Sequence, residues 1–306
     1  MKKKSLLKGI IVLLTLTIVI FNLFSKGVKS DTYLDDEVSK SNTELKKDLE
    51  RLDIESKYLT LYDKTNNKIV YSISGDKKAY PASLTKLMTV MAGIDEVKDV
   101  NEEVKVPIEA YDKLYQEGAS MAGFSPGERV SYKDLLYGAI LPSGGEAAMS
   151  ISYLVSGSEQ GFVDIMNRKS DELGLKNTHF KNSTGLHSED NYSTTNDMSF
   201  LISHALDNSL FREIYSSKRY SMKESNKHSE GMTFRSTLFE KTDSNLILGG
   251  KTGYTTQAGN CLSTYSKING VEYILVTMNA NGKSSRDKIA VRDAENIYQV
   301  VYNNSK

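Results

Sequence analysis

The order of apolar and polar residues predicts strands at both ends of the chain and helices between them. Residues 58–62 and 69–73 are short runs rich in β-branched and aromatic side chains, and the polar stretch 63–68 between them predicts a turn. Three further apolar runs come late in the chain, at residues 245–253, 260–268 and 271–278. Asn269 and Gly270 separate the last two runs and are typical of a tight hairpin turn.

The middle of the chain follows a helical period. Four segments there place apolar residues three or four positions apart, which predicts helices at residues 131–140, 146–154, 160–173 and 195–206. A closing helix is predicted from the apolar side formed by Ile289, Val291, Ala294, Ile297, Val300 and Val301. We therefore expect an α+β fold in which helices pack on an antiparallel sheet built from both ends of the chain.

The first 30 residues have the pattern of a targeting segment. Lys2, Lys3, Lys4 and Lys8 precede an apolar or weakly polar run at residues 9–24, so the amino terminus is expected to stay in the cytoplasm. The length of the run fits either an uncleaved membrane anchor or the core of a cleaved signal peptide. Both alternatives place the rest of the chain on the extracytoplasmic side of a cell membrane, and cleavage would make it a secreted protein.

Two further segments follow this leader. Residues 31–56 are acidic and rich in Lys and Ser, with Leu45, Leu49 and Leu52 at helical spacing, and this composition predicts a polar, partly helical spacer. Residues 57–303 contain the alternating strand and helix patterns and are expected to form the main folded domain.

Charge and cysteine content exclude two classes of protein. Six lysines and no acidic residue lie in residues 1–30, so the remainder carries 33 basic and 39 acidic side chains. Without a basic patch beyond the leader, nucleic acid is not expected as a partner. The single cysteine, Cys261, rules out an intrachain disulfide framework, and its place in a predicted strand at residues 259–265 favours a small buried side chain over a reactive thiol.

Ser83 and Lys86 stand three residues apart where a loop enters an apolar helix. The chain contains three other Ser-x-x-Lys pairs, at Ser5/Lys8, Ser74/Lys77 and Ser285/Lys288. Only Ser83 follows a proline loop and precedes an apolar stripe, formed by Leu84, Leu87, Met88 and Met91. Positions i and i+3 share a helix face, so the lysine amine can reach the serine hydroxyl. The alternative is a serine helix cap with a solvated lysine one turn later.

A second group of functional residues lies late in the chain. Lys251, Thr252 and Gly253 follow the apolar run 246–248 and a pair of glycines. On a strand, the lysine and the threonine offer a cation and a hydroxyl for a substrate carboxylate, and the glycine lets a substrate backbone lie close to the strand edge. Ser-x-x-Lys followed by Lys-Thr-Gly occurs in penicillin-binding proteins and class A β-lactamases, which carry a serine loop between the two.

That intermediate loop is present as Leu-Pro-Ser-Gly-Gly-Glu-Ala-Ala at residues 141–148, with Ser143 followed two residues later by Gly145. Further matching stretches occur at residues 123–128, 134–138, 162–167, 173–175, 178–180, 185–186, 193–198, 251–255 and 258–262. Together these motifs resemble serine-type D-alanyl-D-alanine carboxypeptidases, the low-molecular-mass penicillin-binding proteins of peptidase family S11. The resemblance covers roughly residues 55 to 300 and implies a β-lactamase/transpeptidase-like fold with a mostly helical insertion.

The resemblance also implies roles for the site residues. Ser83 would attack the bond between the two terminal D-alanines of a peptidoglycan stem peptide, with Lys86 as its base, and β-lactam antibiotics would acylate the same serine. Ser143 would relay a proton to the leaving amine. Lys251 and Thr252 would hold the terminal carboxylate, while the backbone amides of Ser83 and Tyr254 would form the oxyanion hole. Neither a metal nor an organic cofactor is required.

The third position of the serine loop departs from the family pattern. The family has an asparagine that orients the lysine and the substrate amide, and this chain has Gly145. Two outcomes are open: a working carboxypeptidase, slower or altered, or a weak or inactive relative that only binds muropeptides.

Two enzymes from other classes are the remaining alternatives. A β-lactamase is the first, although class A β-lactamases lack the stretches from residue 162 to residue 198. A zinc peptidase is the second, because His179, His187, Glu189 and Asp190 lie close together in sequence. Their spacing is not the i, i+4 pair of a helical zinc site.

Overall fold

The structure is a computed structural model that describes residues 43–306. Residues 43–50 form a helix, in agreement with the leucine spacing at Leu45 and Leu49. No helix within residues 43–306 is long and apolar enough to cross a membrane. The expectations for the leader, residues 1–30, lie outside the described residues. The site is built within the compact unit Leu52–Lys306.

The central sheet confirms the expected pairing of both chain ends. Its strand order is β2-β1-β9-β8-β7, and every neighbouring pair is antiparallel. The strands are β1 Ser56–Asp63, β2 Lys68–Ile73, β7 Gly249–Thr255, β8 Gly259–Ile268 and β9 Val271–Ala280. Asn269 has a φ of +48° and Gly270 a φ of +85°, as the predicted hairpin turn between β8 and β9 requires. β7, which carries Lys251, is an edge strand.

The expected helices are confirmed to within two residues at each end. They are α2 Thr85–Glu96, α4 Tyr132–Ile140, α5 Gly145–Ser156, α6 Glu159–Glu172, α7 Thr195–Ala205 and α9 Ile289–Asn304. Short helices η1 Ala82–Leu84, η2 Ile108–Ala110, α3 Asp112–Gln116 and α8 Ser209–Ser216 complete the set in the described part of the chain. Ser131 caps α4 in a reciprocal capping box with Asp134, which fixes where this helix begins.

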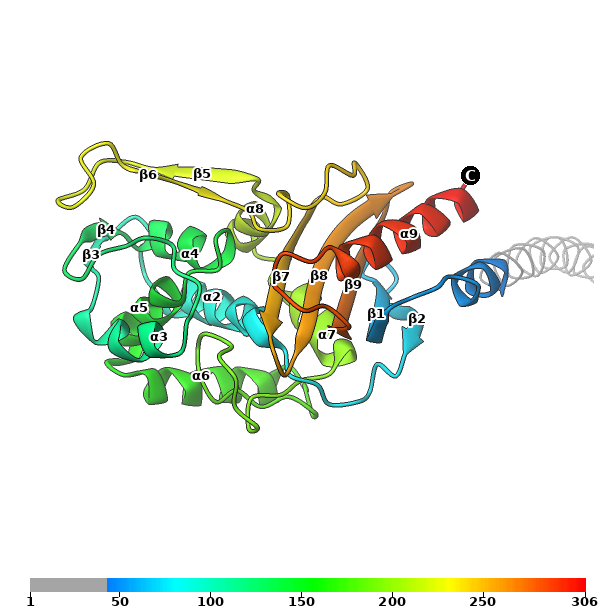
Figure 1. Cartoon of the computed structure of the whole chain (residues 1–306), viewed down its shortest axis with the longest axis horizontal. Coiled ribbons are helices and arrows are strands. Elements are labelled where there is room, and N and C mark those ends of the chain that lie inside the picture. Colours follow the sequence, from blue (N-terminus) through cyan, green and yellow to red (C-terminus); the bar gives the residue numbers. More distant parts are fainter. Residues whose placement is uncertain (1–42) are drawn as a thin grey trace, which may run out of the picture. The chain divides into compact units, whose positions relative to one another are not determined.

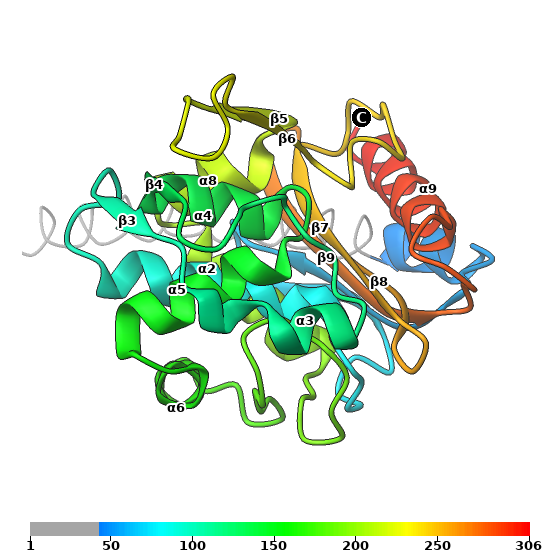
Figure 2. The ribbon, with the colours of Figure 1, turned by 60° about the vertical axis from the view of Figure 1, so that its left-hand side comes forward.

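Helices cover both faces of the sheet. α9 packs on β8 and β9, while α7 packs on β1 and β9 from the other face (Figure 1). α2 leads from the sheet into the helical region, where α4, α5 and α6 surround it (Figures 1 and 2). α2 is buried along most of its length, so the residues at its beginning are held rigidly between the sheet and the helices.

The structure adds two small sheets that the sequence pattern did not predict. One pairs β3 Glu103–Lys105 with β4 Arg129–Ser131, and the other pairs β5 Arg219–Met222 with β6 Met232–Arg235. These strands have only three or four residues, too few for an alternation of apolar and polar side chains to be distinctive.

The strand predicted at residues 245–253 begins only at Gly249. The Ile247 amide donates to the Ser244 carbonyl in a turn, and the Leu248 side chain is exposed. The early part of this apolar run is therefore a turn before β7.

Candidate active site

The nucleophile candidate Ser83 lies on the short turn η1, directly before α2. Its neighbour Ala82 has a φ of +48°, which is uncommon for a residue with a side chain. Two glycines pack closely against this turn: a Cβ on Gly185 would lie 1.9 Å from the Ala82 carbonyl oxygen, and a Cβ on Gly253 would lie 3.0 Å from the Ser83 amide nitrogen. Close approach to η1 thus requires a glycine at 185 and leaves little room for a side chain at 253.

Lys86 lies one turn after the serine and is almost fully buried, with 3% of its surface exposed. Its Nζ lies 3.1 Å from Ser83 Oγ and donates to the Thr184 carbonyl at 2.6 Å. Burial lowers the pKa of Lys86 to about 7, while the negative charge of Glu146 opposes part of that shift. A lysine with such a pKa is partly neutral near pH 7 and can accept the serine proton.

The two other Ser-x-x-Lys pairs within residues 43–306 have no such contact, and Ser5/Lys8 lies outside the described residues. Ser74 and Lys77 are both exposed, and the lysine pairs with Asp76. The backbone carbonyl of Ser285 accepts a hydrogen bond from Lys241. Of the pairs within residues 43–306, only Ser83 and Lys86 have their side chains hydrogen-bonded to each other.

The Thr184 carbonyl is held toward Lys86 by the buried side chain of Asn182. Asn182 Oδ1 accepts from the amides of Thr184 and Gly185, and its Nδ2 donates to the Leu186 carbonyl. Asn182 thus holds the backbone on both sides of the Thr184 carbonyl. Because this carbonyl accepts from Lys86 Nζ, the asparagine also orients the lysine.

A second serine and lysine meet on the other side of the site. Lys251 Nζ on β7 donates to Ser143 Oγ at 2.8 Å and to the Thr252 carbonyl at 2.8 Å. Ser143 lies in the loop between α4 and α5 with a φ of +68°, a strained conformation held by the buried surroundings. The contact joins the helical region to the sheet edge and brings together residues 108 positions apart.

Lys251 is buried without a carboxylate partner among the described residues. Burial, followed by the charges of Lys86 and Lys241, places the pKa of Lys251 well below its usual range. A bound carboxylate would supply the missing counter-charge and stabilise the charged form. The next residue, Thr252, has its Oγ1 2.6 Å from Thr237 Oγ1.

Protein atoms surround the position of Gly145, the first residue of α5. A Cβ there would lie 3.2 Å from Ala119 Cβ, 3.2 Å from Leu114 Cδ2 and 3.3 Å from the Ser120 carbonyl oxygen. The Gly145 amide donates to that carbonyl at 2.7 Å. The segment before β4 therefore packs against the glycine, and a side chain at 145 would require these neighbours to shift by a few tenths of an ångström.

Glu146 anchors the same segment from the next residue. It is fully buried, and Oε1 accepts from the amides of Ala122 at 2.6 Å, Gly123 at 2.7 Å and Phe124 at 3.2 Å. Burial raises the pKa of Glu146, and the three backbone donors oppose the shift. Its charge also acts on Lys86, so this carboxylate links the segment to the general-base candidate.

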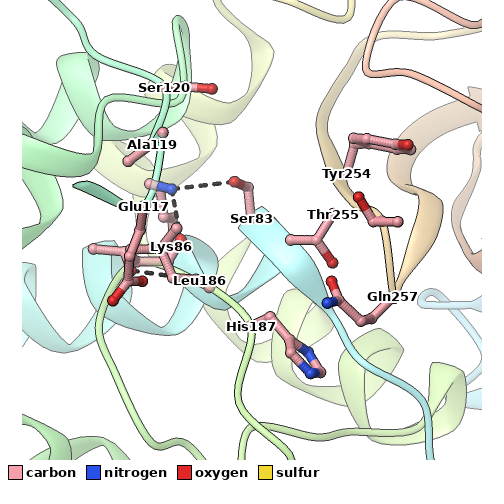
Figure 3. A pocket seen from close by; sticks show the side chains of 14 residues that line it. Ser83, Lys86, Glu117, Ala119, Ser120, Leu186, His187, Tyr254, Thr255 and Gln257 are labelled. Carbon is pink, nitrogen blue, oxygen red and sulfur yellow. Dashed lines mark hydrogen bonds between the residues drawn. The ribbon is translucent and has the colours of Figure 1, made fainter. Parts of the chain in front are cut away.

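Ser83 and Lys86 line a cavity of about 450 Å³. Glu117, Ala119 and Ser120 form one wall of it, and Tyr254, Thr255 and Gln257 form another (Figure 3). Leu186 and His187 close a third side. The lysine and the serine face each other at the bottom of an open pocket that a peptide end can enter.

The residues suggested for a zinc site do not form one. Among the residues that the structure describes, no group of three or more His, Cys, Asp or Glu side chains is placed to hold a metal ion. The His179 ring contacts Tyr192 and bonds the Asp190 carbonyl, whereas His187 packs against Tyr80 and lines the cavity.

The structure brings together Ser83, Lys86, Ser143, Lys251, Thr252, Gly253 and Tyr254, and Gly145 lies against Ala119 and Ser120 in the wall of the same cavity. The catalytic and binding roles given to these residues stay predictions. Sequence reasoning assigned no role to Asn182, Thr184, Glu146 or Ser120. Gly185, Leu186 and Glu146 could be seen in the sequence as parts of motifs. The Thr184 carbonyl could not be predicted, because a backbone carbonyl has no sequence signal of its own.

Comparison with known proteins agrees with this geometry. Residues 42–282 match the family described as D-alanyl-D-alanine carboxypeptidase, peptidase S11. The D-alanyl-D-alanine carboxypeptidase DacF of Bacillus subtilis is 30% identical over 237 residues, which cover 76% of this chain and 59% of DacF. The D-alanyl-D-alanine endopeptidase of Escherichia coli is 32% identical over 225 residues, covering 73% of this chain and 71% of that protein. This chain thus spans less than two thirds of the length of DacF.

Solved structures show the same fold. The Streptomyces K15 DD-transpeptidase superposes with a TM-score of 0.74 at 25% identity, covering 81% of this chain and 98% of that one. The fold is therefore that of the β-lactamase/transpeptidase-like DD-peptidases. With a family match over most of its length and the two serine–lysine contacts in place, the chain belongs to peptidase family S11, the D-alanyl-D-alanine carboxypeptidases.

Proposed function

We propose that this protein is a serine D-alanyl-D-alanine carboxypeptidase that removes the terminal D-alanine from peptidoglycan stem peptides. The observation that carries the proposal is the contact of 3.1 Å between Lys86 Nζ and Ser83 Oγ, next to the contact of 2.8 Å between Lys251 and Ser143. A nucleophile with a base of lowered pKa and a buried cation for a terminal carboxylate are the groups this reaction needs.

In the proposed mechanism, Lys86 takes the Ser83 proton as Oγ attacks the carbonyl carbon between the two D-alanines. The amides of Ser83 and Tyr254 stabilise the oxyanion, and Ser143 passes a proton to the nitrogen of the departing D-alanine. Water then hydrolyses the acyl-enzyme. Lys251 and Thr252 bind the carboxylate before the bond breaks, and the same groups position the carboxylate of a β-lactam, which acylates Ser83.

Location belongs to the same proposal. The lysine-flanked apolar run at residues 9–24 supports placing the enzyme at the extracytoplasmic face of a bacterial membrane, where peptidoglycan lies. The leader would then act as an anchor or as a cleaved signal.

The test is release of D-alanine by the purified protein. With a stem pentapeptide, we expect one D-alanine per peptide, no loss of rate with a chelator, and one covalent penicillin adduct on the peptide that contains Ser83. A protein that binds muropeptides but releases no D-alanine and takes up no penicillin would contradict the proposal. Fast turnover of penicillin, instead of a long-lived adduct, would identify a β-lactamase.

Gly145→Asn, which introduces the family's asparagine, is expected to slow acylation of Ser83 about 10-fold, because its neighbours must shift by a few tenths of an ångström and a misplacement of about 1 Å costs about 100-fold. The new Cβ would press on Ala119, Leu114 and the Ser120 carbonyl at 3.2 to 3.3 Å and shift the cavity wall. Stopped-flow penicillin acylation measures the effect, with Gly145→Ala as the smaller step. An increase in rate would show that the glycine is a handicap in an unchanged site.

A further inference from the structure

Ser120 presents an unused hydroxyl to the cavity that holds the nucleophile. Its side chain is exposed and lines the same cavity as Ser83 and Lys86 (Figure 3). Within residues 43–306 the hydroxyl makes no hydrogen bond, although the Ser120 carbonyl is bonded to Gly145. An exposed serine hydroxyl can bind water, so the lack of a protein partner does not by itself indicate a ligand. The position of Ser120 in the cavity is the second observation.

The position is unusually well fixed for an exposed residue. The Gly145 amide holds the Ser120 carbonyl at 2.7 Å, and the Ala119 amide donates to the Leu114 carbonyl at 2.9 Å. Two residues further on, Glu146 Oε1 binds the Ala122 and Gly123 amides. The segment is thus anchored to α3 just before Ser120 and to the start of α5 at and after it, which preorganises the backbone that carries the hydroxyl.

Ser120 also has a chemical property that its neighbours in the wall lack. Glu117, Gly118, Ala119 and Ser120 line this side of the cavity, facing Tyr254 and Thr255 at the end of β7 (Figure 3). Of these four side chains, only the serine hydroxyl can donate a hydrogen bond at neutral pH. A peptide bound along the edge of β7 turns its other edge toward this wall, where its carbonyl oxygens need a donor.

We propose that the Ser120 hydroxyl donates a hydrogen bond to the carbonyl oxygen of the acylamino group on the acyl side of the scissile bond. In a stem peptide this is the carbonyl of the residue before the two D-alanines, and in a penicillin it is the side-chain amide. The proposal rests on the proposed function, and it makes Ser120 a substrate-binding residue in a site whose position 145 has no side chain.

Two β-lactams separate this contact from a general effect on the site. Benzylpenicillin carries the side-chain amide, whereas 6-aminopenicillanic acid has an amine in its place and keeps the lactam and the carboxylate. Ser120→Ala is expected to lower the second-order acylation constant of benzylpenicillin about 10-fold, as loss of one neutral hydrogen bond does. Its constant for 6-aminopenicillanic acid should stay within about two-fold of the wild type, since the lost contact has no partner there.

Matched variants complete the test. Ser120→Thr keeps the hydroxyl and should restore the preference for benzylpenicillin, and Ser125→Ala in the same segment, outside the cavity, should leave both constants unchanged. Equal slowing of both compounds by Ser120→Ala, or no slowing of either, would overturn the inference alone. A wild-type protein that neither compound acylates would overturn the proposed function, and this inference with it.

Discussion

Ser83→Ala is expected to abolish both D-alanine release and covalent penicillin binding. The variant removes the only atom that forms the acyl bond, and loss of a serine nucleophile lowers turnover by roughly 10⁶-fold in other serine hydrolases. Ser83 is half-buried on η1, and alanine fits the same backbone, so the fold should be retained. Intact-mass spectrometry after incubation with benzylpenicillin measures the adduct, and a D-alanine assay measures turnover.

The matched control for this variant is Ser74→Ala. Ser74 also precedes a lysine by three residues, but it is exposed and lies outside the cavity. We expect Ser74→Ala to behave as the wild type in both measurements. A penicillin adduct that persists in Ser83→Ala would mean that another residue is the nucleophile, and the assignment of the site would be wrong.

The same contrast shows what the sequence could establish. Four Ser-x-x-Lys pairs have identical spacing, and the apolar stripe after Ser83 singled out the pair that the structure joins at 3.1 Å. The sheet could also be predicted from the sequence, because short apolar runs at both chain ends have few ways to pair. The pattern of apolar residues thus predicted the fold, and the order of the motifs along the chain predicted the main side chains of the site.

Short-range packing could not be predicted in this way. Nothing in the sequence shows that the segment around Ala119 and Ser120 lies against Gly145, because that contact depends on which loop reaches the start of α5. From the sequence alone, replacement of the family's asparagine by Gly145 therefore suggested an empty space in the site. In the structure the glycine is in contact with protein on several sides, so the change at 145 and the position of Ser120 form one local arrangement.

Electrostatics also depends on the assembled structure. Lys86 is far from Lys241 and Lys251 in sequence, yet the charges of Lys86 and Lys241 both lower the pKa of Lys251. Glu146 opposes the lowering at Lys86. Because Lys251 is buried with no carboxylate beside it among the described residues, a bound anionic peptide end would favour its charged form and raise its pKa.

Lys86→Met is expected to lower the rate of acylation by about 10³-fold, within the range that a positioned general base contributes. Methionine is unbranched, only one atom shorter than lysine and uncharged, so we expect the variant to fold with an unfolding temperature near that of the wild type. Lys77→Met, at the exposed pair Ser74/Lys77, is the matched control and should leave the rate unchanged.

The pH dependence shows whether Lys86 acts as the base. With a pKa of about 7, Lys86 is protonated in acid and cannot accept the Ser83 proton, so the wild-type maximal acylation rate should rise about 10-fold per pH unit up to pH ~6 and level off above pH ~8. Saturating benzylpenicillin separates this rate from carboxylate binding at Lys251. In Lys86→Met the rise near pH 7 should disappear together with the rate. A variant that keeps this rise would place the titrating base elsewhere and leave Lys86 with only a structural role.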